Sequence, residues 1–349
     1  MSPPEPPRSR RRYLRPRTIL VFLLLAALGS NAVAFVLAWA MTHFETGAES
    51  TAHFRDRSDW DKVLCFCRNL SLPRPASPRD PPRWAREECT TLHYPGAGNA
   101  DLETWRVAGK ASQPKVLLFH GYAGCKISLQ HAAHEFHNFG CETWMVDFHG
   151  SGNSAGHTTT VGYDEAEDVA ATVRQALNSR AQNEPMILFG SSMGAAAVLC
   201  AVHRFHLQPD ALILECPFDR LVTTIGNRCH MVGMPAFPAA EMMVFWGGVQ
   251  GGFNGFTHNP VEYARDVSCP TLLMDGDQDE RVGLSHAKEI AAALGAHCTF
   301  KVFTGAGHVM YADQVTQEWE GVVQDFLKSH HLLMQKTGLA VTEQPGGVE

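Results

Sequence analysis

The sequence predicts an α/β protein with a mostly parallel, doubly wound sheet, a small cap insertion and an N-terminal transmembrane helix. Three observations predict this class. Short apolar runs alternate with longer amphipathic segments over about 240 residues, as in a parallel sheet covered by helices. One apolar run leads directly into a G-x-S-x-G turn followed by a helix of small residues. The chain also begins with an arginine-rich segment and a long uncharged stretch.

The uncharged stretch, residues 18–41, is long enough to span the hydrocarbon core of a bilayer. Six arginines precede it within residues 1–17, so the positive-inside rule predicts a cytoplasmic N-terminus with the rest of the chain on the non-cytoplasmic side. We therefore expect a single-pass signal anchor. The alternative is a signal peptide cleaved in the region of residues 26–30, which would leave a secreted or periplasmic domain.

The charge of the chain argues against nucleic acid as a partner. The formal net charge is −7, but without residues 1–41 the remainder has 23 basic and 35 acidic residues. Such an acidic body without a basic patch lacks the electrostatic footprint of a DNA- or RNA-binding protein. Ten cysteines form no recognisable framework, and their pairing stays open.

Composition divides the rest of the chain into segments. Residues 42–87 are rich in Pro, Arg, Asp and Ser, which predicts a linker or stalk. Residues 88–334 are expected to form the α/β domain, and residues 335–349 a disordered tail.

Within the domain, strands and helices are expected to alternate. The predicted strands cover residues 115–120, 142–147, 185–189, 211–215, 271–274 and 299–303. The predicted helices cover residues 128–139, 164–179, a segment that starts at the turn after residue 192, and residues 285–294 and 315–328.

The alternation breaks at about residues 221–264. This insertion is rich in Gly, Met, Phe and Trp, which indicates a small cap that forms an apolar lid over a substrate pocket. The alternative is an excursion that only packs on the sheet.

The candidate nucleophile is Ser192. It stands at the centre of the turn, between Gly190 and Gly194, and these glycines allow the strand and the following helix to pass closely. A serine hydroxyl is a weak nucleophile at neutral pH, so it needs a base and a group that orients the base.

The candidate base is His308, which follows the last predicted strand in a Gly-Ala-Gly-His sequence. The candidate orienting acid is Asp279, placed in the same way after the preceding strand. Its competitors are the neighbouring carboxylates Asp275, Asp277 and Glu280, together with Glu215 at the end of another strand. The chain order Ser, Asp, His is the order expected for such a triad on a doubly wound sheet.

Two backbone N–H groups are the candidate oxyanion donors. One belongs to Met193, directly after the candidate nucleophile, and the other to Tyr122, in a glycine-containing loop after an apolar strand. The alternative for the second loop is an ordinary strand-to-helix connection.

These motifs together resemble the α/β-hydrolase superfamily, in its lipase, esterase and serine-aminopeptidase-like branch. The resemblance covers about residues 88–330 and rests on His120-Gly121, the run from Asp147 to Ser154, the turn around Ser192, the run from Pro270 to Asp279, and Gly307-His308. It implies hydrolysis of an ester, thioester or amide without a cofactor. Residues 1–85 lie outside it.

The sequence thus predicts a membrane-tethered serine hydrolase, and we expect it to cleave carboxylic esters or lipid-like acyl substrates. The alternatives are a serine peptidase, amidase or thioesterase and, in a different class, a non-catalytic binding protein on a hydrolase fold. We expect no metal, since His131, His134 and His137 on one predicted helix lack a converging ligand set. The oligomeric state stays open.

Overall fold

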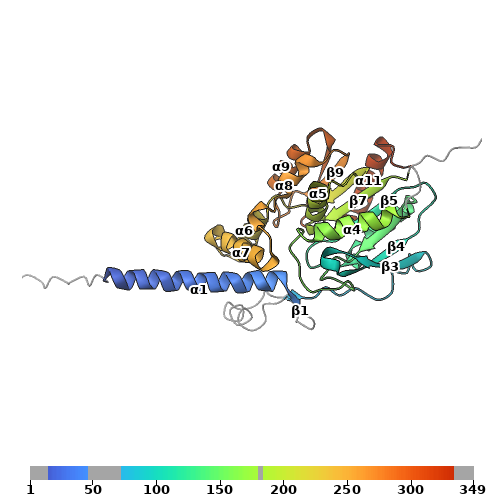
Figure 1. The fold of residues 1–349 in the computed structure, drawn as a ribbon. Helices are drawn as coiled ribbons and strands as arrows, with labels where there is room; N and C mark the ends of the chain where they lie inside the picture. The colour runs from blue at the N-terminus through green and yellow to red at the C-terminus, as the bar shows by residue number, and fades with distance from the viewer. Residues whose placement is uncertain (1–14, 46–71, 180–183, 334–349) are drawn as a thin grey trace, which may run out of the picture.

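A computed structural model describes residues 15–45, 72–179 and 184–333 of the chain. Eight strands form one sheet in the order β10-β9-β8-β7-β5-β6-β4-β3 (Figure 1). Their bounds are β3 (Cys89–Pro95), β4 (Asp101–Val107), β5 (Lys115–Phe119), β6 (Glu142–Val146), β7 (Met186–Ser191), β8 (Ala211–Glu215), β9 (Thr271–Gly276) and β10 (Cys298–Phe303). Neighbouring strands from β6 across to β10 are parallel, whereas β4 pairs antiparallel with β6 and β3 antiparallel with β4.

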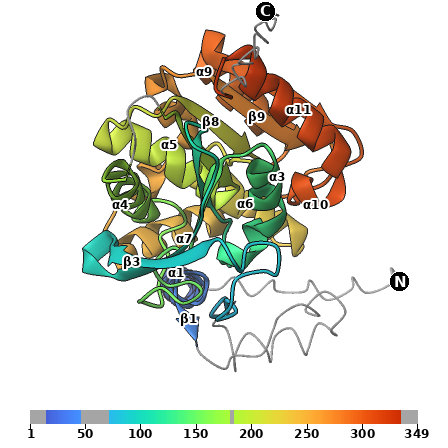
Figure 2. The same cartoon turned by 90° about the vertical axis from the view of Figure 1, so that its right-hand side faces the viewer.

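The central strands are apolar because both faces of the sheet are covered. Every residue of β5, β6, β7, β8 and β9 is buried, as expected for parallel strands between two helical layers. Figure 2 shows α4 (Glu165–Leu177) and α5 (Met193–Phe205) on one side of the sheet, and α3 (Gln130–Asn138) and α11 (Thr316–Ser329) on the other. Each side has its own apolar core.

The remaining described helices are shorter or lie outside these two layers. They are α1 (Pro16–Thr42), η2 (Ala97–Asn99), η3 (Lys126–Leu129), α6 (Leu221–Met231), α7 (Ala236–Gly251), η4 (Gly255–Thr257), α8 (Pro260–Tyr263), η5 (Ala264–Asp266), α9 (Leu284–Leu294), η6 (Gly295–His297) and α10 (Tyr311–Gln314).

The predicted α/β class with a mostly parallel sheet is confirmed, but the pair β3–β4 was missing from the prediction. Only the short turn η2 separates these two antiparallel strands, so the alternation of strands with long helices gives no sign of the pair. The signal was the alternating burial of β4, in which Leu102 and Thr104 are buried and Asp101 and Glu103 are not.

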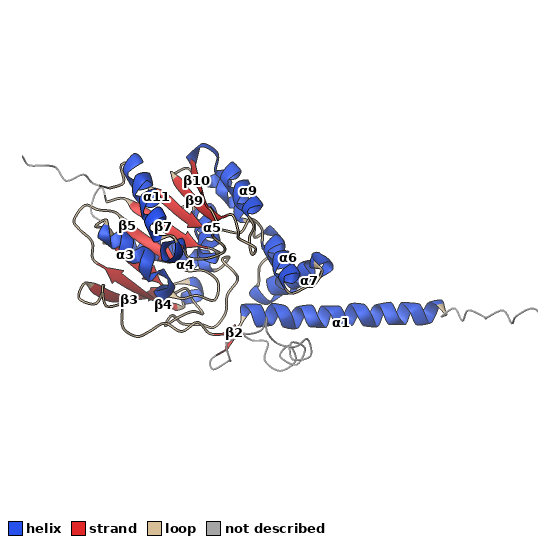
Figure 3. Cartoon of the chain, turned by 180° about the vertical axis from the view of Figure 1, so that it is seen from behind, coloured by secondary structure: helices blue, strands red, loops and turns tan. Residues whose placement is uncertain are grey.

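Helix α1 is the one helix in the described part of the chain that is long and apolar enough to cross a membrane. It projects from the body, and its C-terminal half lies beside α7 (Figures 1 and 3). The insertion predicted at residues 221–264 contains the helices α6 and α7, which pack on each other, and α7 packs along the C-terminal part of α1.

The segment predicted as a stalk, residues 42–87, differs from that expectation where the structure describes it. Phe44–Glu45 and Leu72–Pro73 form a two-stranded parallel pair, β1 and β2. Arg74 donates a hydrogen bond to the Gly150 carbonyl, and Ala85 is fully buried in the core beneath α3. Apolar contacts and backbone bonds thus fix residues 72–87 on the domain despite their proline content, while residues 46–71 and the predicted tail, 335–349, lie outside the described residues.

Candidate active site

The turn around Ser192 is a sharp connection between β7 and α5. Ser192 has φ 52° and ψ −113°, a backbone conformation that costs energy for a residue with a side chain. A Cβ atom on Gly190 would lie 2.6 Å from the Ala195 backbone, and one on Gly194 would lie 2.2 Å from the Phe119 carbonyl oxygen. Both positions therefore require glycine, and the strained turn presents the Ser192 hydroxyl at the N-terminus of α5.

Ser192, His308 and Asp279 form a hydrogen-bonded chain at the carboxyl edge of the sheet. The Ser192 Oγ atom lies 2.9 Å from His308 Nε2, and His308 Nδ1 lies 2.7 Å from Asp279 Oδ2. The second carboxylate oxygen of Asp279 accepts hydrogen bonds from the backbone N–H groups of Arg281 and Val282. An acceptor at Nδ1 fixes the tautomer in which Nε2 is free to take a proton from the hydroxyl.

The surroundings of Asp279 keep its carboxylate ionised. Burial alone would raise its pKa, but the hydrogen bond and charge of His308 and the two backbone N–H groups outweigh burial and lower the pKa. The carboxylate is therefore ionised at neutral pH, as the orienting group of a triad must be.

The four competing carboxylates do not contact His308. Asp277 and Glu280 are exposed, and the buried Glu215 accepts a hydrogen bond from the Trp319 indole. Asp275 is buried beside Tyr311. Burial raises the pKa of Glu215 to about 8, and burial together with the charge of Asp279 raises that of Asp275 to about 7. Both groups lie at the ends of strands, where sequence position alone did not separate them from Asp279.

The loop after β5 passes next to the candidate nucleophile. A Cβ atom on Gly121 would lie 3.4 Å from both the Ser191 carbonyl oxygen and the Ser192 Cβ atom. The next residue in this loop is Tyr122, and Met193 is the first residue of α5, where N–H groups have no partner within the helix. The two candidate oxyanion donors thus come from segments that meet at Ser192.

His120 holds this loop in place. Its ring is fully buried, Nδ1 lies 2.8 Å from the Gly121 carbonyl oxygen, and Nε2 accepts a hydrogen bond from the backbone N–H of Phe148. Burial lowers the pKa of His120, so the ring stays neutral and can donate at one nitrogen while accepting at the other. The ring links the loop after β5 to the loop after β6.

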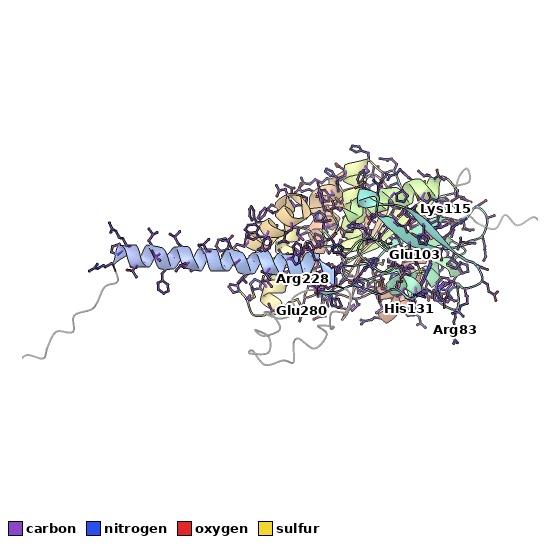
Figure 4. All side chains as sticks on the ribbon, turned by 60° about the horizontal axis from the view of Figure 1, so that its bottom comes forward. Arg83, Glu103, Lys115, His131, Arg228 and Glu280 are labelled. Atoms are coloured by element: carbon purple, nitrogen blue, oxygen red, sulfur yellow. The ribbon has the colours of Figure 1, made fainter. Side chains whose placement is uncertain are left out.

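The side chain of Tyr122 connects the same loop to α1. Its hydroxyl donates a 2.6 Å hydrogen bond to the Met41 carbonyl oxygen, and the Arg228 guanidinium of α6 lies 4.7 Å from the centre of its ring. Figure 4 shows Arg228 near the inner end of α1, and Lys115, where β5 begins, toward the opposite end of the body. The site therefore faces the cap and α1, a connection for which the sequence contained no signal.

Among the described residues, Cys216 forms with Asp279 and His308 a group of three potential metal ligands. Its sulfur and the nearest ligand atoms of Asp279 and His308 lie within 4.8 Å of one another. Burial raises the pKa of the thiol well above its usual value, so the metal-free thiol is protonated and a metal ion would have to displace this proton. The hydrogen bonds within the triad account for the other two groups.

Comparisons with known proteins agree with the fold. Residues 110–242 match the serine aminopeptidase (S33) family of hydrolases. An esterase from Pyrococcus furiosus superposes with a TM-score of 0.60 at 20% identity, over 73% of this chain and 98% of its own. The chain belongs to the α/β-hydrolase superfamily. The predicted superfamily resemblance is thereby confirmed.

Two further similar proteins are an esterase with a lower TM-score and an uncharacterized protein. An esterase from Exiguobacterium antarcticum has a TM-score of 0.52 at 16% identity, over 68% of this chain and all of its own. An uncharacterized Bacillus subtilis protein, YqkD, is 22% identical over 242 residues, which are 69% of this chain and 79% of that protein. At these identities the structural likeness concerns the fold, and the chemistry has to be argued from the site.

Proposed function

We propose that this α/β-hydrolase is a membrane-anchored serine hydrolase that cleaves carboxylic esters or lipid-like acyl substrates. The observation that carries the proposal is the hydrogen-bonded chain from Ser192 through His308 to Asp279. The esterases among its structural neighbours and the apolar surroundings of the cap favour an acyl substrate.

In the proposed mechanism the Ser192 Oγ atom attacks the acyl carbonyl carbon while His308 Nε2 takes the hydroxyl proton. The Asp279 carboxylate stabilises the resulting imidazolium, and the N–H groups of Tyr122 and Met193 donate to the oxyanion. As the ester bond breaks, His308 returns the proton to the leaving alkoxide and an acyl-serine remains. Water then attacks this acyl-enzyme, with His308 acting first as base and then as acid, which releases the carboxylic acid and restores Ser192.

The decisive test uses the full chain in detergent micelles or nanodiscs and p-nitrophenyl esters from acetate to palmitate. The Ser192→Ala variant should lose activity by roughly a thousandfold or more, because the nucleophile is absent while folding is unaffected. Ser191→Ala is a matched control, since this neighbouring serine is the last residue of β7 and the hydrogen-bonded chain from Ser192 to Asp279 does not include it. Equal rates for the wild type and Ser192→Ala across the series would exclude this esterase mechanism.

A serine amidase or peptidase is the second candidate, favoured by the serine aminopeptidase family match over residues 110–242. The same acyl-enzyme chemistry applies, but His308 must protonate an amine leaving group. Aminoacyl p-nitroanilides assayed beside the esters separate the two, because a peptidase should hydrolyse them with a higher kcat/KM.

For the anchor we propose that α1 spans the membrane once, with the N-terminus in the cytoplasm and residues 42–349 on the opposite side. Protease protection of a C-terminal tag in sealed, right-side-out cells tests this orientation. The tag should be digested without permeabilisation, whereas a protected tag would reverse the topology.

A further inference from the structure

Exposed large apolar side chains of the described residues are concentrated in two parts of the chain, α1 and the cap. On the cap they are Met231, Val232, Phe237, Phe245, Val249 and Phe256, which together are called the cap surface here. Among the other described residues outside α1, Leu177 of α4 is the one large apolar side chain exposed to a similar degree. Apolar exposure gathered in one region marks a surface that contacts another apolar phase.

The cap surface is also poor in charge. From Met231 to Phe256 the sequence contains one Asp, Glu, Lys or Arg, which is Glu241. Charged side chains are costly inside a bilayer, and their near absence from these 26 residues fits a lipid environment. An aqueous surface would carry charges of both signs.

The length of α1 places the cap surface relative to the membrane. Contacts with α7 begin at Asn31, which accepts a hydrogen bond from the Trp246 indole, and continue at Phe35, whose carbonyl accepts one from Gln250. The free part of α1, from Pro16 to Ser30, therefore spans about 22 Å at 1.5 Å per residue. A hydrocarbon core is about 30 Å thick.

The remaining thickness must come from the part of α1 that packs on α7. With Arg17 at the cytoplasmic interface, about 20 residues of helix reach to the region of Leu37. The segment from Asn31 to Leu37 would then lie in the far leaflet, and α7 would lie there with it. The resulting depth, about 10 Å, is the depth to which interfacial helices insert.

Apolar contacts continue from this region toward the candidate site. A pocket between α1, α6 and α7 is lined by Ala38, Met41, Ile225 and Met243. The apolar cluster around it includes Ala196, on the helix that begins after Ser192, and Val282, whose N–H donates to Asp279. One apolar cluster thus extends from the pocket between α1, α6 and α7 to the candidate site.

We infer that the cap surface lies in the lipid of the far leaflet beside α1, and that the enzyme takes its acyl substrate from that leaflet. The lipid contact rests on the proposed anchor, and the route of the substrate rests on the proposed function. The cap surface contacts the bilayer, because α7 packs on the part of α1 that must lie within the bilayer if α1 is to span it.

The lipid contact is tested on the full chain in phosphatidylcholine vesicles. A photo-crosslinking amino acid replaces Phe237 or Phe245, whose side chains are 76% and 50% exposed, or Leu177, which is 47% exposed and serves as the matched control. Lipid adducts should form at positions 237 and 245 but not at 177. Adduct yields at 237 and 245 no higher than at 177, or crosslinks to a second copy of the chain, would overturn the inference.

The substrate route is tested by Phe245→Asp, with Leu177→Asp as control, on two substrates. Phe245→Asp should lower hydrolysis of a long-chain ester embedded in the vesicle by about tenfold, because an exposed aromatic side chain that contacts lipid is replaced by a charge. It should leave hydrolysis of dissolved p-nitrophenyl acetate unchanged, and Leu177→Asp should change neither rate. Equal losses on both substrates would overturn the route. Should the wild type hydrolyse neither, the proposed function fails, and the crosslinks still decide the lipid contact.

Discussion

Asp279 and Asp277 lie two residues apart in one loop and have different surroundings. Asp279 Oδ2 accepts from His308, whereas the exposed Asp277 accepts from the Gly305 backbone N–H. In Asp279→Asn the side-chain amide favours the wrong imidazole tautomer, so kcat on p-nitrophenyl esters should fall by roughly 10³ to 10⁴. Asp277→Asn keeps an acceptor for Gly305 and should leave kcat within about twofold. Equal losses in the two variants would show that Asp279 has no special part in the reaction.

The sequence named Ser192, His308 and Asp279 as candidates, but it left other carboxylates as competitors of Asp279. Ser192 is marked by the glycines that its turn requires, and His308 by its position after the last strand. Asp275, Asp277 and Asp279 lie within five residues, and the path of the backbone separates them. A Cβ atom on Gly276 would lie 2.1 Å from the Ala306 carbonyl oxygen, and this close approach brings Asp279 to His308 while leaving Asp275 beneath the loop.

At the scale of elements, the contact between α5 and β5 determines the shape of the site. Gly194→Ala would push its methyl group against the Phe119 and His120 carbonyl oxygens, which lie 2.2 and 2.7 Å from an ideal Cβ position. We expect a loss of about 1–3 kcal/mol in the free energy of unfolding, measured by urea denaturation, together with a loss of activity as the loop after β5 moves.

The matched control is Gly321→Ala in α11, where no atom lies within 4 Å of the added Cβ. Alanine is the better helix former, so this variant should gain up to about 1 kcal/mol and keep full activity. A Gly194→Ala variant as stable and as active as the wild type would contradict the tight packing of the turn.

The cap shows what patterns of elements leave undetermined. Its position was visible in the sequence because the strand–helix alternation stops there. The bounds of α6 and α7 were not visible, because α7 is apolar around much of its circumference and lacks the one-sided periodicity that marks a surface helix. Such a helix contacts apolar surroundings on several sides, which only the packed structure reveals.

Over the whole molecule, a buried ion pair makes stability depend on pH. His149 lies beside Asp168, which also accepts from the Ala97 N–H. Burial opposes the charge of His149, but the hydrogen bond and charge of Asp168, with the charges of Glu165 and Asp164, raise its pKa from 6.5 to about 9. The folded state therefore binds the proton more tightly than the unfolded state does.

The stabilisation from this pair should be fully present below pH 6.5 and disappear as the pH rises through about 9. The difference between the two pKa values corresponds to on the order of 3 kcal/mol. Thermal unfolding of the wild type and of His149→Gln at intervals from pH 6 to 10 measures it. The gap in Tm between the two proteins should narrow across this range, and a constant gap would refute the assignment.

The architecture could be predicted where it depends on residues that are close together in the sequence. The mostly parallel sheet and the helices that cover it follow from alternation in the sequence. The packing of residues 72–87 on the domain and of α1 on the cap involves partners far apart in the chain, such as Ala85 beneath α3 and Asn31 against Trp246. Composition alone predicted a free stalk there.

The hydrogen bond from Tyr122 to the Met41 carbonyl has a consequence for how this protein can be handled and regulated. The last turn of the anchor supplies an acceptor to the loop that shapes the candidate site. A protease that cut the chain just after α1 would release a domain whose cap is no longer covered by α1. The loop after β5 would lose its hydrogen bond to Met41, so we expect the released domain to be inactive. Grafting the body onto an unrelated stem would have the same effect.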